Sequence, residues 1–294
     1  MTSALLQKAY AYCVETARTH YENFPVASRL LPRGMREPVS VIYTFARNAD
    51  DFADEGEFTP GERLQNLDHY SAELHKIERN EETDELLFIA LKDVVHRYQL
   101  PLYLFHDLLQ AFRTDVTKKH YQTFPELLDY CRLSANPVGR MLLYLNSAFS
   151  ANNISDKPTD QELAYSDAIC TGLQLINFFQ DIAQDYDENR RIYIPLEDMQ
   201  RFSVTETDLA KKINNTYTQA LMKFQLQRAR SLYQQGKPLG HTLSGRFGLE
   251  LRLIYAGGER VLHKLEQTTV DIYARPRLTR LDKLAMARDT LLKG

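Results

Sequence analysis

Three aspartates lie close together in the first quarter of the chain, at a spacing that places them on one side of a helix. Asp50, Asp51 and Asp54 share that side with Arg47 and Tyr43 at 3.6 residues per turn, and we call these five residues the first stripe. The opposite side is apolar and carries Ile42, Phe45, Ala49 and Phe52. Carboxylates at these spacings repel one another, so a bound divalent cation would compensate them. An ordinary solvated helix face is the alternative interpretation.

A second stripe follows a mostly apolar helix later in the chain. Gln174, Asn177, Asp181 and Asp185 are spaced by 3, 4 and 4 residues, and the other positions carry Leu173, Leu175, Ile176, Phe179, Ile182 and Ala183. Carboxylates on a buried helix must be paired or must line a cavity, because unpaired buried charges are strongly penalised. Two such helices facing each other form metal sites in bundles. Oxygen ligands without His or Cys select hard cations, so the pattern predicts Mg²⁺ that binds a diphosphate.

Aromatic residues are plentiful, with 17 tyrosines and 14 phenylalanines. Those near the stripes are Phe24, Tyr43, Phe45, Phe52, Tyr130, Phe178, Phe179 and Tyr193. Each is also explained by simple core packing. Ring faces stabilise cations by roughly 0.5–2 kcal/mol, however, which suits a carbocation formed when a diphosphate leaves.

The elements that position these residues are predicted to be helices, since no convincing run of alternating strands occurs. Thr59, Pro60 and Glu62 form a capping-box signal that predicts a helix start at Pro60. Pro137 should kink a helix that opens at Pro125. The predicted helices cover residues 60–78, 84–98, 101–112, 125–149, 160–189, 208–213, 217–235, 249–267 and 277–292, with a short extended segment at 192–195.

The composition excludes several classes of protein. A chain of 294 residues with 44% hydrophobic and 26% charged residues is an ordinary folded protein rather than a disordered one. The net charge of −3 provides no basic field for nucleic-acid binding. Cys13, Cys131 and Cys170 are far apart, which favours neither disulfides nor a zinc–thiolate site and suits a reducing compartment. Neither a secretory signal nor a run of transmembrane length is evident, so membrane contact would be peripheral.

The two stripes also resemble a known family. Arg47-x-x-Asp50-Asp51-x-x-Asp54 and Asn177-x-x-x-Asp181-x-x-x-Asp185, followed by Arg190-Arg191-Ile192-Tyr193-Ile194-Pro195, resemble the paired aspartate motifs of squalene and phytoene synthases. Tyr130-Cys131 and Val138-Gly139 resemble the central helix of that family, and the resemblance spans about residues 15–285. It implies the all-α isoprenoid synthase fold, as a single domain over residues 1–294 with the helices bundled around a central cavity. It also implies Mg²⁺-dependent head-to-head prenyl diphosphate chemistry, or a later step from presqualene diphosphate.

Three departures from the usual synthases resemble the hydroxysqualene synthases of bacterial hopanoid pathways. His20–Ser28 replaces a serine-rich segment, Gln180 stands where an arginine usually precedes the aspartate, and Asn136-Pro137 replaces small residues. That branch ionises presqualene diphosphate and captures the cation with water, giving hydroxysqualene and diphosphate. It needs no NADPH, and we find no GxGxxG in a strand–turn–helix context. Squalene synthases, which reduce the same cation with NADPH, are commonly longer and end in a membrane anchor.

The resemblance implies roles for individual residues. The metal ligands would be Asp50, Asp51, Asp54, Asn177, Asp181 and Asp185. The catalytic residues would be Asp50, Asp54, Asp181, Asp185, Gln180 and Tyr193. The substrate-binding residues would be Phe24, Tyr43, Arg47, Tyr130, Gln174, Asn177, Arg191, Tyr255 and Arg275, where arginine suits phosphate through its planar donor fork. Gln180, Asn136 and Gln184 would fix the attacking water, or would only cap helix kinks.

Two other functions fit the same motifs. The chain could join two prenyl diphosphates as a presqualene diphosphate or phytoene synthase, or it could be a non-catalytic helical assembly factor of the pathway. Such factors usually lose ligand carboxylates, whereas both motifs are complete here. The expected partners are presqualene diphosphate, the presqualene diphosphate synthase and an amine-oxidase-like reductase of the same pathway, with no nucleic acid. We expect a cytoplasmic location, with peripheral contact at the inner face of a bacterial membrane as an open alternative.

Overall fold

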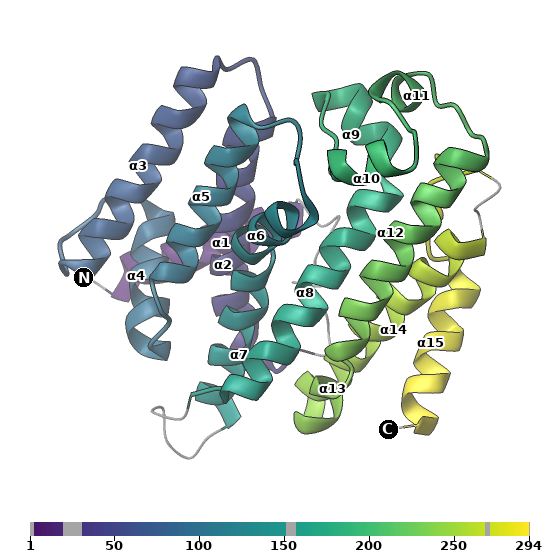
Figure 1. Ribbon diagram of the computed structural model, residues 1–294. Coiled ribbons are helices and arrows are strands. Elements are labelled where there is room, and N and C mark those ends of the chain that lie inside the picture. Colours follow the sequence, from purple (N-terminus) through teal and green to yellow (C-terminus); the bar gives the residue numbers. More distant parts are fainter. Residues whose placement is uncertain (1–2, 20–30, 151–156, 268–270, 294) are drawn as a thin grey trace. The chain divides into compact units, whose positions relative to one another are not determined.

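The computed structural model describes residues 3–19, 31–150, 157–267 and 271–293, and Figure 1 shows that these residues are mainly helical. The helices are α1 (Ser3–Thr19), α2 (Arg33–Asp54), α3 (Pro60–Glu78), α4 (Leu86–Tyr98), α5 (Tyr103–Thr117), α6 (Phe124–Ser134), α7 (Asn136–Ser150), α8 (Asp160–Gln180), α9 (Ile182–Asn189), α10 (Leu196–Arg201), α11 (Glu206–Ala210), α12 (Thr216–Gln235), α13 (Leu239–Thr242), α14 (Gly245–Gln267) and α15 (Arg280–Lys293). Within the described ranges the only β pairing is one isolated bridge between His120 and Ile192. The all-α prediction is confirmed. No described helix is both long and apolar enough to span a bilayer.

The chain divides into two compact units. One contains residues 1–117 and 137–163, and the other contains residues 118–136 and 164–294. The first stripe lies in the first unit and the second stripe lies in the second unit. That the whole chain acts as a single domain stays a prediction.

The core of the first unit fixes the orientation of α2. This helix packs against α1, α3, α4 and α5. Phe45 is fully buried, and its ring lies 5.4 Å from that of Tyr70, 6.3 Å from that of Phe88 and 5.1 Å from that of Phe105. Ile42 and Ala49 are also buried, and Phe52 is half-buried. Because the apolar side of α2 faces this core, the first stripe lies on the side with greater exposure, as its periodicity predicted.

Helix ends with local sequence signals lie close to where they were predicted. The capping box of Thr59 and Glu62 is present, and α3 begins at Pro60. The prediction of a single kinked helix over residues 125–149 is wrong, because α6 ends at Ser134 and α7 begins at Asn136. Pro137 occupies the first turn of α7, where its missing N–H has no hydrogen bond to lose. The proline therefore starts a new helix rather than bending an existing one.

The helix predicted over residues 160–189 is also interrupted. Asp181 leaves helical geometry at φ −108° and ψ 14°, so that α8 ends at Gln180 and α9 begins at Ile182. Backbone bonds from Asp181 N to Asn177 O (2.9 Å) and from Asp185 N to Asp181 O (2.8 Å) flank the bend. Of the segment 192–195 predicted to be extended, Ile192 forms the isolated bridge with His120 and its N–H donates to Lys119 O at 2.9 Å, whereas Ile194 lies in a bend.

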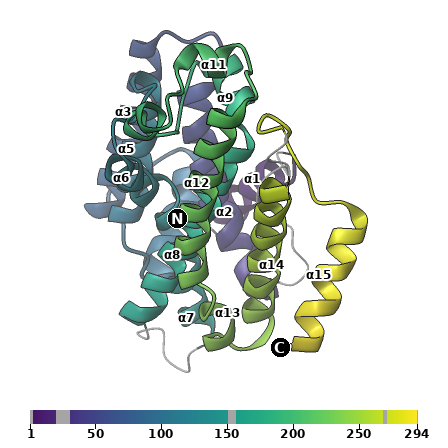
Figure 2. The same cartoon turned by 45° about the vertical axis from the view of Figure 1, so that its right-hand side comes forward.

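Glycines allow close helix packing around Tyr233 in the second unit. Tyr233 on α12 is fully buried. A Cβ atom on Gly172 of α8 would lie 2.6 Å from the ring of Tyr233 and 2.9 Å from its Cα, and one on Gly258 of α14 would lie 2.4 Å from its hydroxyl. The ring of Tyr233 stacks on that of Tyr255 at 4.6 Å. Figure 2 shows α14 between α12 and α15, and the contacts place α14 against both.

Candidate active site

Arg47 is the centre of an ion-pair group at the end of α2. Its Nη2 lies 2.7 Å from Asp51 Oδ1 and its Nη1 lies 3.8 Å from Asp50 Oδ2, and it also pairs with Glu55 immediately after the helix. Burial would lower the pKa of Arg47, but the charges of Asp51, Glu55 and Asp50 together raise it above its ordinary value. The arginine therefore stays charged and offsets part of the negative charge. Glu55 was missed by the sequence analysis, although it directly follows the first stripe.

Arg63 of α3 fixes the end of the helix that carries these acids. Its guanidinium donates to the carbonyl oxygens of Phe52 (3.0 Å), Glu55 (3.0 Å) and Gly56 (2.9 Å). These carbonyls are at the C-terminus of α2, where a cation also interacts favourably with the helix dipole. Tyr43 and Asp54 are half-buried on the same helix. Phe24, predicted to bind substrate, lies outside the described residues.

Asp181 and Asp185 form an acidic pair at the bend between α8 and α9. Arg275 pairs with both oxygens of Asp181, through Nε at 2.5 Å and Nη2 at 2.9 Å. Burial, and then the charge of Asp181, raises the pKa of Asp185 to about 7, although Arg191 and Arg275 act in the opposite direction. Burial is the main cause, so the ionised form of Asp185 is disfavoured next to the Asp181 carboxylate. A divalent cation bound to these carboxylates would favour the ionised form.

Gln180 positions the segment that carries Arg275. Its amide Nε2 donates to the carbonyl oxygen of Pro276 at 2.5 Å, next to the residue that pairs with Asp181. Gln180 was predicted to fix water, and its contact with Pro276 was not predicted. The water role stays a prediction. Asn136, proposed for the same task, is buried and accepts a hydrogen bond from Thr171 Oγ1 at 2.9 Å.

Aromatic rings gather beside the acidic pair. Tyr193 stacks on Phe178 with ring centroids 3.5 Å apart, and its centroid lies 5.9 Å from that of Tyr130. Arg191 is 5% exposed, and its Nη1 donates to the hydroxyl of Tyr193 at 3.2 Å. One small cavity is lined by Asp185, Arg191, Tyr193 and Phe178 together with neighbouring apolar residues. The second unit thus brings a carboxylate, a guanidinium and two aromatic faces to one place. Tyr121, whose ring lies 5.7 Å from that of Tyr193, was missed by the sequence analysis.

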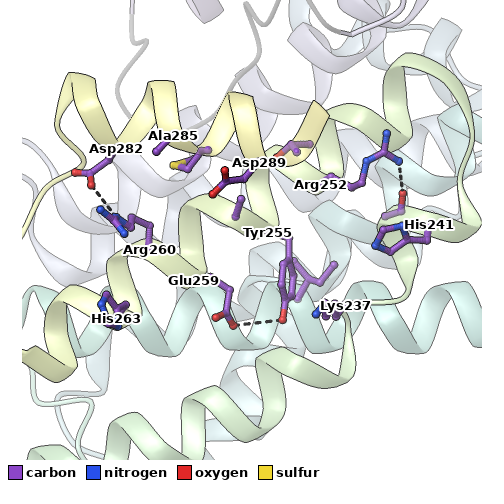
Figure 3. Close-up of a pocket in the computed structure, with 15 residues that line it drawn as sticks. Lys237, His241, Arg252, Tyr255, Glu259, Arg260, His263, Asp282, Ala285 and Asp289 are labelled. Carbon is purple, nitrogen blue, oxygen red and sulfur yellow. Dashed lines mark hydrogen bonds and ion pairs between the residues drawn. The ribbon is translucent and has the colours of Figure 1, made fainter. Parts of the chain in front are cut away.

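The remaining predicted site residues of the second unit differ in their exposure and in their location. Gln174 is half-buried on α8, whereas Asn177 is exposed. Tyr255 lines a separate cavity of about 510 Å³ between α14 and α15, shown in Figure 3. Its hydroxyl donates to Glu259 Oε1 at 3.3 Å. The structure therefore places Tyr255 in that cavity, and its role toward substrate stays a prediction.

The donor set of both stripes fits Mg²⁺. We searched the described ranges for His, Cys, Asp or Glu side chains that bring three or more ligand atoms within 4.8 Å of one another. The groups found include α3 residues, and none includes a residue of either stripe. Each stripe therefore presents separate carboxylates rather than a closed ligand cage. Mg²⁺ is commonly held by one or two carboxylates and completes its shell with water and phosphate oxygens.

Known proteins are similar to this chain in sequence and in fold. The squalene/phytoene synthase family matches residues 17–284. The chain is 33% identical over 255 residues to a hydroxysqualene synthase of Rhodopseudomonas palustris, covering 86% of this chain and 82% of that protein. It is 30% identical over 237 residues to a 15-cis-phytoene synthase of Synechocystis sp., covering 80% and 69%. The crystal structure of squalene synthase HpnC from Alicyclobacillus acidocaldarius matches with a TM-score of 0.81 and 32% identity, covering 92% of this chain and 97% of that one.

Proposed function

Because the chain belongs to the squalene/phytoene synthase family, we propose that it converts presqualene diphosphate and water into hydroxysqualene and diphosphate in a Mg²⁺-dependent reaction. The observation that carries the proposal is the pair of neighbouring carboxyls at the bend between α8 and α9, where burial and then the charge of Asp181 raise the pKa of Asp185 to about 7. Arg191 and the stacked rings of Phe178 and Tyr193 border the same carboxyl. These groups match the needs of a departing diphosphate and of the carbocation left behind.

The carboxylates of both stripes are the proposed metal ligands, with Asp51 and Asn177 in supporting positions. When bound, Mg²⁺ supplies the positive charge that makes diphosphate a good leaving group. Arg47, Arg191 and Arg275 would bind the diphosphate through their planar donor forks. Arg275 now pairs with Asp181, and a cation on that carboxylate would free its guanidinium for phosphate oxygens.

The aromatic faces of Tyr193 and Phe178 stabilise the carbocation in this proposal. When the C–O bond to diphosphate breaks, its electron pair leaves with the diphosphate. Water then forms the new C–O bond, and the proton that it loses passes to the released diphosphate. Gln180, Asn136 and Gln184 are the candidates to hold that water. Since the amide nitrogen of Gln180 donates to Pro276, its carbonyl oxygen is the atom that would accept a hydrogen bond from water.

The alternative is head-to-head prenyl transfer by a presqualene diphosphate or phytoene synthase. The similarity to a phytoene synthase at 30% identity favours this candidate nearly as much as the first. Both reactions need the same acids and the same metal, so the stripes do not distinguish them. A non-catalytic assembly factor is less well supported, because all the predicted ligand residues are retained.

Product analysis tests the proposal. Purified protein is incubated with Mg²⁺ and presqualene diphosphate, or with Mg²⁺ and farnesyl diphosphate, in both cases without NADPH, and organic-phase products are identified by mass spectrometry. We expect hydroxysqualene from presqualene diphosphate and no product from farnesyl diphosphate. Presqualene diphosphate formed from farnesyl diphosphate would instead identify the condensing enzyme. Asp54→Asn and Asp185→Asn should abolish either activity, and a chain inactive on both substrates would support the assembly factor.

A further inference from the structure

Two histidines and a glutamate meet where the end of α3 packs against the start of α5. His75 and Glu78 lie in the last turn of α3, and His106 lies near the start of α5. His75 Nδ1 is 2.7 Å from Glu78 Oε2, and His106 Nε2 is 3.3 Å from Glu78 Oε1. The two imidazole centroids are 5.0 Å apart. Figure 1 shows the two helices side by side, as their contacts require.

We propose that His75, Glu78 and His106 bind a divalent transition-metal ion of the Zn²⁺ class. One ligand atom from each of the three side chains lies within 4.8 Å of the other two. With metal–nitrogen bonds of about 2.0–2.1 Å, the ligand atoms of a tetrahedral zinc site are roughly 3.3 Å apart. The distances of 2.7 and 3.3 Å run from the two imidazoles to different oxygens of Glu78 and are both near that value, so small side-chain movements would bring one carboxylate oxygen and both nitrogens around one ion.

The chemistry of these ligands distinguishes the site from the aspartate stripes. Imidazole nitrogen suits zinc, copper and nickel, whereas Mg²⁺ prefers an all-oxygen shell. Glu78 contributes one negative charge, and the C-terminal end of the α3 dipole also favours a cation. The side chains of His75, Glu78 and His106 are 51%, 41% and 26% exposed, so the ion could enter from solvent and keep a water ligand.

A metal at this position would join two antiparallel helices at one end. Near the middle of α3, Arg113 of α5 already donates to Asp68 Oδ1 (2.9 Å) and to the carbonyl oxygen of Leu67 (3.2 Å). Both helices also pack against α2, which carries the first stripe. The expected effect is therefore a more stable first unit, because an ion that binds only the native arrangement stabilises it by mass action.

A second group, formed by two residues of α3 and the residue before α4, provides a control. His69, Glu73 and Glu85 also lie within 4.8 Å of one another. Glu73, however, is 3% exposed, and its oxygens accept hydrogen bonds from Lys76 (2.5 Å) and Thr83 (2.6 Å). Using this carboxylate for a metal would break the hydrogen bond from the buried Thr83 and the ion pair with Lys76, which is costly. We therefore expect no metal at the second group.

The experiment uses the full chain without a histidine tag, freed of metal and then supplied with excess Mg²⁺ to occupy the carboxylates of the stripes. Zn²⁺ is titrated by calorimetry, and Co²⁺ is titrated by visible absorption, which reports tetrahedral coordination. Wild type should bind one Zn²⁺ per chain, with a Tm several degrees higher in its presence. His75→Ala and His106→Ala should each weaken binding at least about 100-fold, since losing even an outer partner costs 10–100-fold. His69→Ala should bind like wild type.

Three results would overturn the proposal. They are no Zn²⁺ binding by wild type, unchanged binding by His75→Ala and His106→Ala, or equal loss in His69→Ala. Far-UV circular dichroism and the Tm shift caused by Mg²⁺ with pyrophosphate show that each variant is folded and retains the aspartate site. A loss of Zn²⁺ binding in a variant that keeps both signals therefore reports the histidines alone.

Discussion

Replacing Asp185 by asparagine should stabilise the metal-free protein at pH 8 while abolishing activity. In the folded protein, burial and then the charge of Asp181 raise the pKa of Asp185 from 3.8 to about 7. The native state therefore holds a proton that the unfolded chain has released. It follows that the free energy of unfolding falls as the pH rises from about 4 to about 7. Asparagine is similar in shape and carries no charge, so it removes this penalty.

The magnitude follows from the displacement of the pKa. A pKa displacement of about three units, at 1.36 kcal/mol per unit, limits the gain in the free energy of unfolding at pH 8 to roughly 4 kcal/mol. Side-chain relaxation and water reduce this, so we expect a gain of about 2–3 kcal/mol. For a chain of this size that corresponds to a Tm increase of roughly 4–12 °C. At pH 5 the folded protein keeps the proton while the unfolded chain has largely released it, so roughly a third to a half of the gain should remain, and it should vanish only below about pH 4.

Thermal and urea unfolding in EDTA between pH 5 and pH 8 test this prediction. The matched control is Asp187→Asn on the same helix, where the exposed carboxylate pairs with Lys212 at 2.8 Å. Exposed pairs contribute about 0–1 kcal/mol, so this variant should show no gain at pH 8. Adding Mg²⁺ should stabilise wild type and leave Asp185→Asn almost unchanged. An equal Tm difference at pH 5 and pH 8, or the same gain in Asp187→Asn, would refute the reasoning.

Two further substitutions test other parts of the second unit. Arg275→Ala removes the counter-charge of Asp181, so the Tm of the metal-free protein at pH 8 should fall. The increase in Tm that Mg²⁺ alone causes should become larger. An unchanged Tm response to Mg²⁺ in scanning fluorimetry would contradict this prediction. Gly172→Ala would place a Cβ atom 2.6–2.9 Å from atoms of Tyr233 and should cost about 1–3 kcal/mol in urea unfolding. The control Gly61→Ala, where nothing lies within 4 Å of the added atom, should be neutral or slightly stabilising.

Local sequence signals predicted the fold well. The start of α3 depends on the capping box of Thr59 and Glu62, which involves only neighbouring residues. The side of α2 that faces the core follows from the periodicity of Ile42, Phe45 and Ala49, and these three residues are buried. Such features need no knowledge of the rest of the chain, so they can be predicted from short windows.

Contacts between distant residues could not be predicted in this way. The bidentate pair of Arg275 with Asp181 and the hydrogen bond of Gln180 to Pro276 join residues 94 and 96 positions apart. The bend at Asp181 has no local glycine or proline signal. Periodicity placed Asn177 on the acidic face but could not show that it is exposed. The types of residue in the site were therefore predictable, while their partners were not.

The position of Arg275 in the chain also orders the assembly of the site during synthesis. Asp181 and Asp185 leave the ribosome many residues before Arg275, so α8 and α9 can form while the two acids still lack that counter-charge. Contacts between distant residues form late because the intervening chain must first be closed into a loop. A nascent chain that stops before residue 275 would therefore expose an acidic pair with no arginine on Asp181. Binding of a metal to such intermediates would be governed by the acids alone, and the complete site would mature only when the segment before α15 arrives.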